Sequence, residues 1–144
     1  MIKKIVTLGT LLLAATFASA GDDPGHERHE LMEGVRDNAK LIGEMLRGQR
    51  DFDSAKQLQA LKEWADVAAK FGDLFPEGSQ GGEAAPAIWE DREGFDLALM
   101  KWAEATQAAI DANPQTLEDS RKAVGPVFNT CKGCHDTYRI EDED

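Results

Sequence analysis

CKGCHDTYR, residues 131–139, lies near the end of this 144-residue chain and contains both of its cysteines, with a histidine directly after the second. Positions 131, 134 and 135 fall on one side of an α-helix, because residues three and four apart are neighbours on a helix surface. Apolar residues at helical spacing surround the motif, so the last helix is expected over about residues 117–140. Pro126 lies inside this segment and is expected to kink or split it.

Three further segments, at about 24–49, 54–72 and 86–112, repeat an apolar residue every three or four positions. Met45 and Met100, in the first and third of these segments, are expected to be core methionines. Asp51 or Asp53 is expected to cap the second helix, and Thr116 with Asp119 the last one. Residues 72–86 are rich in glycine and proline and predict one long loop.

The mature chain has no run of alternating polar and β-branched residues, so strands are not expected. Four amphipathic helices joined mostly by short turns predict an all-α protein, an antiparallel four-helix bundle. Bundles of this kind often build cofactor sites between facing helices.

The first twenty residues have the pattern of a secretory signal peptide. A basic start, MIKK, precedes a short apolar run that ends in Ala18-Ser19-Ala20, an A-x-A cleavage pattern. We therefore expect residues 1–20 to be removed, residues 21–144 to form one domain, and the protein to reside in the periplasm. The formal net charge of −11 argues against nucleic acid or an anionic membrane as partner and favours a basic patch on another protein.

The pair Cys131 and Cys134, followed by His135, has several chemical interpretations. A thioredoxin-type redox pair needs a neighbouring βαβ pattern, which is absent from the sequence. A disulfide would close only a tiny loop, and a zinc site would need ligands from the other end of the chain, where His26 and His29 lie. In an exported protein C-x-x-C-H instead predicts one covalently attached haem c, held by two thioethers with His135 as the iron ligand.

Four stretches together resemble the cytochrome c′ family, the class II c-type cytochromes. They are RHELM (28–32), FPEGS (75–79), PAIWED (86–91) and CKGCHDTYR (131–139). The resemblance covers essentially the whole mature chain and implies a four-helix bundle with haem on the C-terminal helix. It implies that His135 is the proximal ligand and Cys131 and Cys134 the attachment sites. It also implies that Arg28 and Arg139 lie near the haem, Arg28 as a partner for a propionate.

The resemblance places Met32 at the distal position, where two outcomes stay open. If its thioether binds iron, the haem is six-coordinate, and the protein is expected to transfer single electrons to and from periplasmic redox proteins in transient complexes. If Met32 only packs over the iron, a five-coordinate haem is expected to bind small gases such as NO and CO. From its residue type alone, Met32 is equally a core methionine.

Other function classes have weaker support in the sequence. A peroxidase or nitric-oxide reductase needs distal acid–base groups, and the first helix offers Arg28 and His29 at best, so we expect no enzyme. His26 and His29 are expected to be exposed. A haem-free helical binding module conflicts with the intact C-x-x-C-H. Homodimerisation through the first two helices, seen in the family, is a hypothesis here, because their outward residues are mostly charged.

Overall fold

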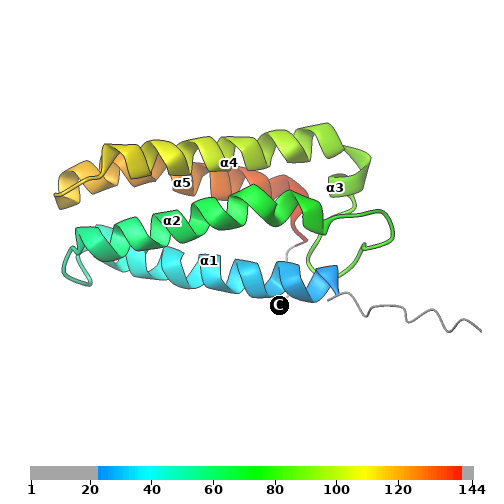
Figure 1. Ribbon diagram of the computed structural model, residues 1–144, viewed down its shortest axis with the longest axis horizontal. Coiled ribbons are helices and arrows are strands. Elements are labelled where there is room, and N and C mark those ends of the chain that lie inside the picture. Colours follow the sequence, from blue (N-terminus) through cyan, green and yellow to red (C-terminus); the bar gives the residue numbers. More distant parts are fainter. Residues whose placement is uncertain (1–22, 141–144) are drawn as a thin grey trace, which may run out of the picture.

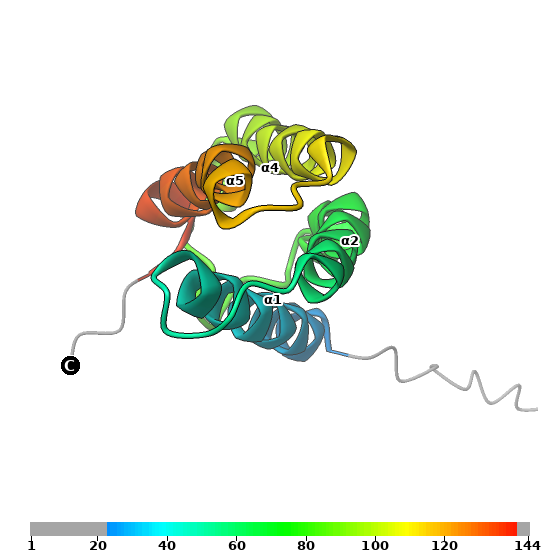
Figure 2. The same cartoon turned by 90° about the vertical axis from the view of Figure 1, so that its left-hand side faces the viewer.

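The structure is a computed structural model that describes residues 23–140. The expected signal peptide, residues 1–20, lies outside this range. Four long helices dominate it: α1 (Pro24–Leu46), α2 (Ser54–Phe71), α4 (Arg92–Ala112) and α5 (Leu117–Tyr138). Each runs antiparallel to the long helix before it (Figure 1), and seen end-on they form the four corners of a bundle (Figure 2). The predicted all-α, antiparallel four-helix bundle is confirmed.

Two helices, α2 and α5, begin at the capping residues predicted from the sequence. Asp53 accepts a hydrogen bond from the backbone N–H of Lys56 at 3.0 Å and caps α2. Thr116 Oγ1 accepts from the N–H of Asp119 at 3.2 Å, and its hydroxyl donates to the Asp119 carboxylate at 2.8 Å. Each such cap contributes about 1 kcal/mol by satisfying an N–H group that has no partner inside the helix.

The apolar stripes of the four helices meet in one core, as predicted. The side chains that are less than 2 % exposed include Ile42, Met45, Leu61, Trp64, Phe95, Val124 and Val127. Met100 is different, because 49 % of it is exposed, so its predicted place in the core is wrong. Leu99, its neighbour in α4, occupies the inward position of that turn and is 8 % exposed.

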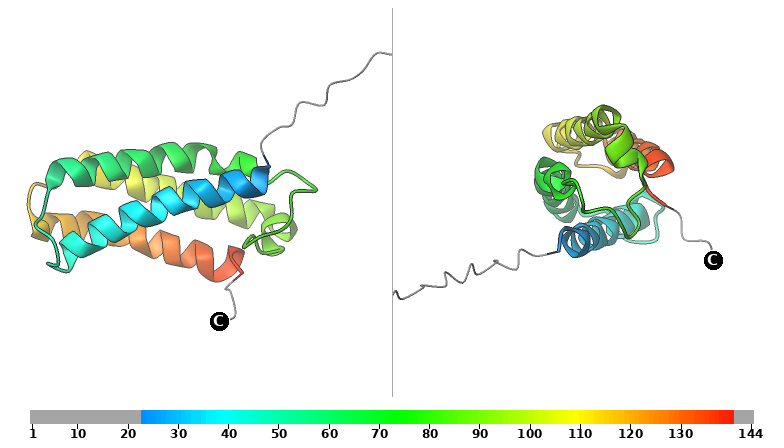
Figure 3. Two further views of the ribbon diagram at one scale, coloured as in Figure 1. Left: turned by 90° about the horizontal axis from the view of Figure 1, so that it is seen from below. Right: turned by 90° about the vertical axis from the view of Figure 1, so that its right-hand side faces the viewer.

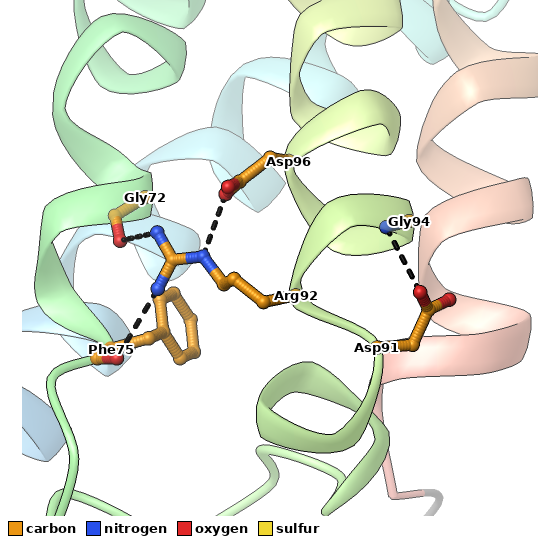
Figure 4. A network of polar contacts seen from close by, with 6 residues as sticks. All are labelled: Gly72, Phe75, Asp91, Arg92, Gly94 and Asp96. Carbon is orange, nitrogen blue, oxygen red and sulfur yellow. Dashed lines mark hydrogen bonds and ion pairs between the residues drawn. The ribbon is translucent and has the colours of Figure 1, made fainter.

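The predicted third helix, residues 86–112, is two helices. A single turn, α3 (Ala87–Glu90), precedes α4, and the chain leaves helical geometry at Asp91, with φ −128° and ψ 62°. The Asp91 carboxylate accepts a hydrogen bond from the N–H of Gly94 at 3.1 Å (Figure 4). Asp91 therefore acts as the N-cap of α4, which requires a non-helical backbone at this residue.

The expected split of the last helix at Pro126 is wrong, since α5 runs from Leu117 to Tyr138 with Pro126 inside it. Proline removes the N–H that would bond the carbonyl of Lys122. Both residues are exposed, so water can take that bond, while Val124 and Val127 on the inner face are fully buried. Packing of the inner face offsets the cost of the proline.

The long loop after α2 closes one end of the bundle. A 3₁₀ turn, η1 (Gly72–Leu74), extends α2, and the chain then passes beside the start of α1 and the end of α5 (Figure 3). Between residues 23 and 140 the only β-type pairing is an isolated bridge between Ala84 in this loop and Arg139. No helix in this range is long and apolar enough to cross a bilayer.

Candidate functional site

A cavity of about 690 Å³ opens among α1, α4, α5 and the long loop. Its walls are largely apolar, and its size lies in the range of sites that hold cofactors. The aromatic and aliphatic lining includes Phe71, Phe75, Ile88, Phe95 and Leu99. All six residues singled out in the sequence also line this one cavity: Arg28, Met32, Cys131, Cys134, His135 and Arg139.

Cys131 and Cys134 lie on α5, are half-buried and form no disulfide. Burial raises the pKa of the Cys131 thiol. Burial, and to a smaller extent the neighbouring Cys131, raises the pKa of Cys134 to about 11. Thiols of this kind are not the low-pKa thiolates of redox sites. Within residues 23–140 no three or more histidine, cysteine, aspartate or glutamate side chains are grouped so that they could hold a metal ion.

His135 lies in the last turn of α5, one residue after Cys134. Its side chain is exposed, but partial desolvation and the nearby Arg139 lower the pKa of the imidazole, while Glu83 and Asp136 act in the opposite direction. The neutral imidazole, which keeps a free nitrogen lone pair for a metal, is thereby favoured.

The loop holds the end of α5 in place. The N–H of Ala85 donates to the carbonyl of Tyr138 at 3.1 Å, and the N–H of Ile140 donates to that of Glu83 at 2.8 Å. The Nε of Arg139 lies 2.8 Å from the Glu83 carboxylate. Arg139 lies close enough to His135 to act on the pKa of its imidazole, and its partner Glu83 was not predicted from the sequence. A lone glutamate in a glycine-rich loop gives no periodic signal.

A second contact fixes the same turn from the other side. The Tyr138 hydroxyl donates to the Asp91 carboxylate at 3.0 Å, and its ring packs edge-on against Phe95 with centroids 5.3 Å apart. Asp91 thus both caps α4 and holds α5. The sequence analysis missed this role because Asp91 was placed inside a continuous helix.

Gly94 leaves room for the contact between Asp91 and Tyr138. A Cβ at this position would lie 2.5 Å from the Tyr138 hydroxyl and would clash with the Asp91 carboxylate. Gly94→Ala is therefore expected to destabilise the holoprotein by about 1–3 kcal/mol, the range for overpacking. Denaturant unfolding followed by circular dichroism would measure this.

Gly34 in α1 is the matched control, because a Cβ there meets nothing within 4 Å. Gly34→Ala is expected to stabilise the protein by about 0.5–1 kcal/mol, the ordinary gain in helix propensity. Equal effects of the two substitutions would show that the space around Gly94 does not matter.

The other wall of the cavity comes from α1. Met32 is half-buried and lines the cavity, and His29, one turn earlier, is exposed at its edge. His26 is exposed too, so both expectations for these histidines are confirmed. Arg28 also lines the cavity, but it is only 7 % exposed, and its guanidinium donates to backbone carbonyls of the loop.

The sulfur and nitrogen atoms that line the cavity fit a haem. Two thiols and an imidazole lie within one turn of α5, a thioether faces the same cavity from α1, and the walls between them are apolar. An apolar macrocycle held by thioethers, with nitrogen and sulfur ligands available to its iron, matches this set.

Comparisons with known proteins agree with this fit. The family model described as Cytochrome C′ matches residues 23–139. The cytochrome c′ of Rhodopseudomonas palustris is 37% identical over 145 residues, covering 96% of this chain and 97% of that protein. A cytochrome c-556 of the same species is 25% identical over 146 residues, covering 96% and 97%.

Solved structures show the same likeness. The cytochrome c′ structure from R. palustris has a TM-score of 0.81 and 32% identity, covering 85% of this chain and 100% of that one. A nitric oxide complex of a mutant cytochrome c prime from Alcaligenes xylosoxidans has a TM-score of 0.75 and 25% identity, covering 83% and 96%. The chain therefore belongs to the cytochrome c′ family, whose covalently attached haem c suits the residues of this cavity.

Proposed function

We propose that this chain is a periplasmic monohaem c-type cytochrome that transfers single electrons. Cys131 and Cys134 would hold the haem, His135 would be the proximal iron ligand, and Met32 the sixth ligand. The observation that carries the proposal is that these four side chains, from α5 and α1, line one apolar cavity.

The chain's own residues account for most of what such a carrier needs. A haem held by these residues would supply the one-electron redox chemistry. Cys131 and Cys134 fix the cofactor on α5, and the contacts of Tyr138 and Arg139 fix the turn that carries His135. The apolar walls keep water away from the site, and a methionine ligand raises the reduction potential.

Docking to partners follows from the charge of the surface. With a net charge of −11 the chain favours basic patches on other redox proteins, in weak and short-lived complexes. The periplasmic location rests on the signal-like residues 1–20. Homodimerisation through α1 and α2 stays a prediction.

The α1 wall offers little for enzymatic turnover. Both terminal nitrogens of Arg28 donate to the loop, and His29 is exposed at the edge of the cavity. A positioned acid–base pair, as a peroxidase requires, is not formed by these two residues. Rapid turnover of peroxide or NO by the purified holoprotein would contradict this part of the proposal.

Gas binding is the second candidate function. It is favoured by the 37% identity to a cytochrome c′ and by the nitric oxide complex among the similar structures. In that case Met32 packs over an open sixth position, and the apolar cavity admits small uncharged gases.

The visible spectrum of the holoprotein, ferric and ferrous, before and after CO, separates the two functions. Electron transfer with Met32 bound predicts a sharp low-spin ferrous spectrum and no response to CO. A broad high-spin spectrum that shifts with CO would instead establish the gas-binding function. Absence of a Soret band in protein matured with haem-attachment machinery would overturn both.

A further inference from the structure

Two arginines from different helices donate to the same stretch of the long loop. Arg28 comes from α1 and Arg92 from the first residue of α4. Both reach residues 72–79, the part of the loop that follows α2, which we call the 72–79 loop. Carbonyls at the end of a helix lack partners inside the helix, so this stretch needs donors from elsewhere.

Arg28 binds the 72–79 loop at two residues, Leu74 and Ser79. Its Nη1 donates to the Leu74 carbonyl at 2.9 Å and to Ser79 Oγ at 3.2 Å, and its Nη2 donates to the Ser79 carbonyl at 2.8 Å. Ser79 Oγ in turn donates to the Pro76 carbonyl at 2.8 Å. Arg28 is 7 % exposed, and these three bonds are partly buried.

Arg92 binds the near half of the loop (Figure 4). Its Nη2 donates to the Gly72 carbonyl at 2.9 Å and its Nη1 to the Phe75 carbonyl at 3.3 Å. Its Nε donates to Asp96 at 2.8 Å, which orients the guanidinium along α4. The two arginines thus reach alternating carbonyls of a short segment.

Phe75 is the side chain that these bonds position. It is 4 % exposed and lines the cavity. Its ring packs edge-on against Phe71, Trp89 and Phe95, with centroids 5.2, 5.8 and 4.8 Å away. The Arg28 guanidinium lies over the Phe75 ring, 4.7 Å from its centroid, at the range of a cation–π contact.

We propose that Arg28 and Arg92 together clasp the 72–79 loop, hold Phe75 as a wall of the cavity, and so limit the size of the ligand that reaches the iron. Arg28 is then a positioning residue and not the propionate partner that the family resemblance implies. The limit on ligand size rests on the proposed haem function, whereas the clasp itself does not.

The test uses the holoprotein with Arg28→Gln, Arg92→Gln and both together. Amide hydrogen exchange of residues 72–79 is expected to speed up about tenfold or more in each single variant, because charge-assisted bonds to the loop are lost. In the double variant, exchange is expected to be faster than in either single variant. The acceleration is expected to be smaller than the product of the two single accelerations, since both arginines act on one segment. Arg47→Gln, at the other end of α1, is the matched control and should leave exchange unchanged.

Ligand entry provides the second readout. Binding of CO and of tert-butyl isocyanide is compared between the ferrous arginine variants and their parent, all in the Met32→Leu background, because a haem with Met32 bound is expected to give no response to CO. The clasp predicts that both Arg28→Gln and Arg92→Gln favour the bulky isocyanide over CO relative to the parent. Arg28→Lys is expected to behave like Arg28→Gln, because a single ammonium cannot replace the two-nitrogen contact. Arg28→Lys and Arg92→Lys replace the glutamine variants in both measurements if the glutamine variants fail to fold.

Two results would overturn the proposal. One is unchanged exchange at residues 72–79 in variants that carry haem normally. The other is a changed pH dependence of the reduction potential in Arg28→Gln, with the parent's pH dependence kept in Arg28→Lys and in Arg92→Gln. That result would make Arg28 a propionate partner. A parent protein without haem would instead refute the proposed function, and exchange would still report on the clasp.

Discussion

A chain in which Cys131 and Cys134 are both alanine is expected to carry no covalently bound haem. These thiols are the only two in the sequence, and both line the cavity from one turn of α5. Without them no thioether can form, and the cofactor would be held by axial ligation and apolar contact alone. Haem staining of a denaturing gel is expected to fall from full intensity in the parent to background in the double variant.

Lys132, between the two cysteines, provides the control. It is exposed and pairs with Asp136 at 2.6 Å across one turn of the helix. Lys132→Ala changes the motif without touching the cavity, so attachment is expected to be complete. Each single cysteine variant retains one attachment point and is expected to stain. Covalent haem in the double variant would show that the attachment chemistry has been assigned to the wrong residues.

The same double variant tests how far the fold depends on the cofactor. The cavity of about 690 Å³ is lined by side chains of the apolar core, among them Phe71, Phe95 and Leu99. Binding of a cofactor to the native state alone stabilises it by mass action. A variant that no longer retains haem is therefore expected to unfold at a lower temperature than Lys132→Ala, measured by circular dichroism.

Local sequence patterns account well for the helices. The apolar stripes, the caps at Asp53 and Thr116, and the glycine-rich loop each depend on residues within a few positions of one another. The haem motif is local as well, since Cys131, Cys134 and His135 fit within one helical turn. These features were therefore predictable without knowledge of the tertiary structure.

The surroundings of the motif depend on distant residues. Arg28 and its hydrogen-bond partner Ser79 are 51 positions apart in the sequence, and Arg139 and its partner Glu83 are 56 positions apart. Such pairs leave no period in the sequence, because each is set by where the long loop crosses the end of the bundle. The contact of Asp91 with α5 is of the same kind, since the Tyr138 hydroxyl that binds its carboxylate lies 47 positions away.

Met32→Leu is expected to convert essentially the whole haem population from low-spin to high-spin and to let ferrous haem bind CO. Leucine keeps the apolar volume of methionine but has no sulfur lone pair, so it fills the cavity without binding iron. The reduction potential is expected to fall, because methionine ligation raises it. Visible spectra with and without CO, together with a potentiometric titration, measure all three changes.

Met45→Leu makes the same replacement on the same helix at a site away from the cavity. Met45 is fully buried, and its sulfur accepts a 3.4 Å contact from the N–H of Asp53. Its replacement is expected to cost less than about 1.5 kcal/mol of stability and to leave the spectrum unchanged. A spectral change in Met32→Leu but not in Met45→Leu would therefore belong to the ligand and not to general loosening of α1.

His29 decides the remaining case. It lies one turn before Met32 and lines the same cavity, so its imidazole is a nitrogen ligand available on α1 near the site. If Met32→Leu stays low-spin, adding His29→Ala to that variant should make the haem high-spin. This result would identify His29, and not Met32, as the sixth ligand. If the parent is already high-spin and binds CO, Met32→Leu should change only the affinity for gas. Met32 would then be a wall of the gas site, because an iron with an open sixth position needs no ligand from α1.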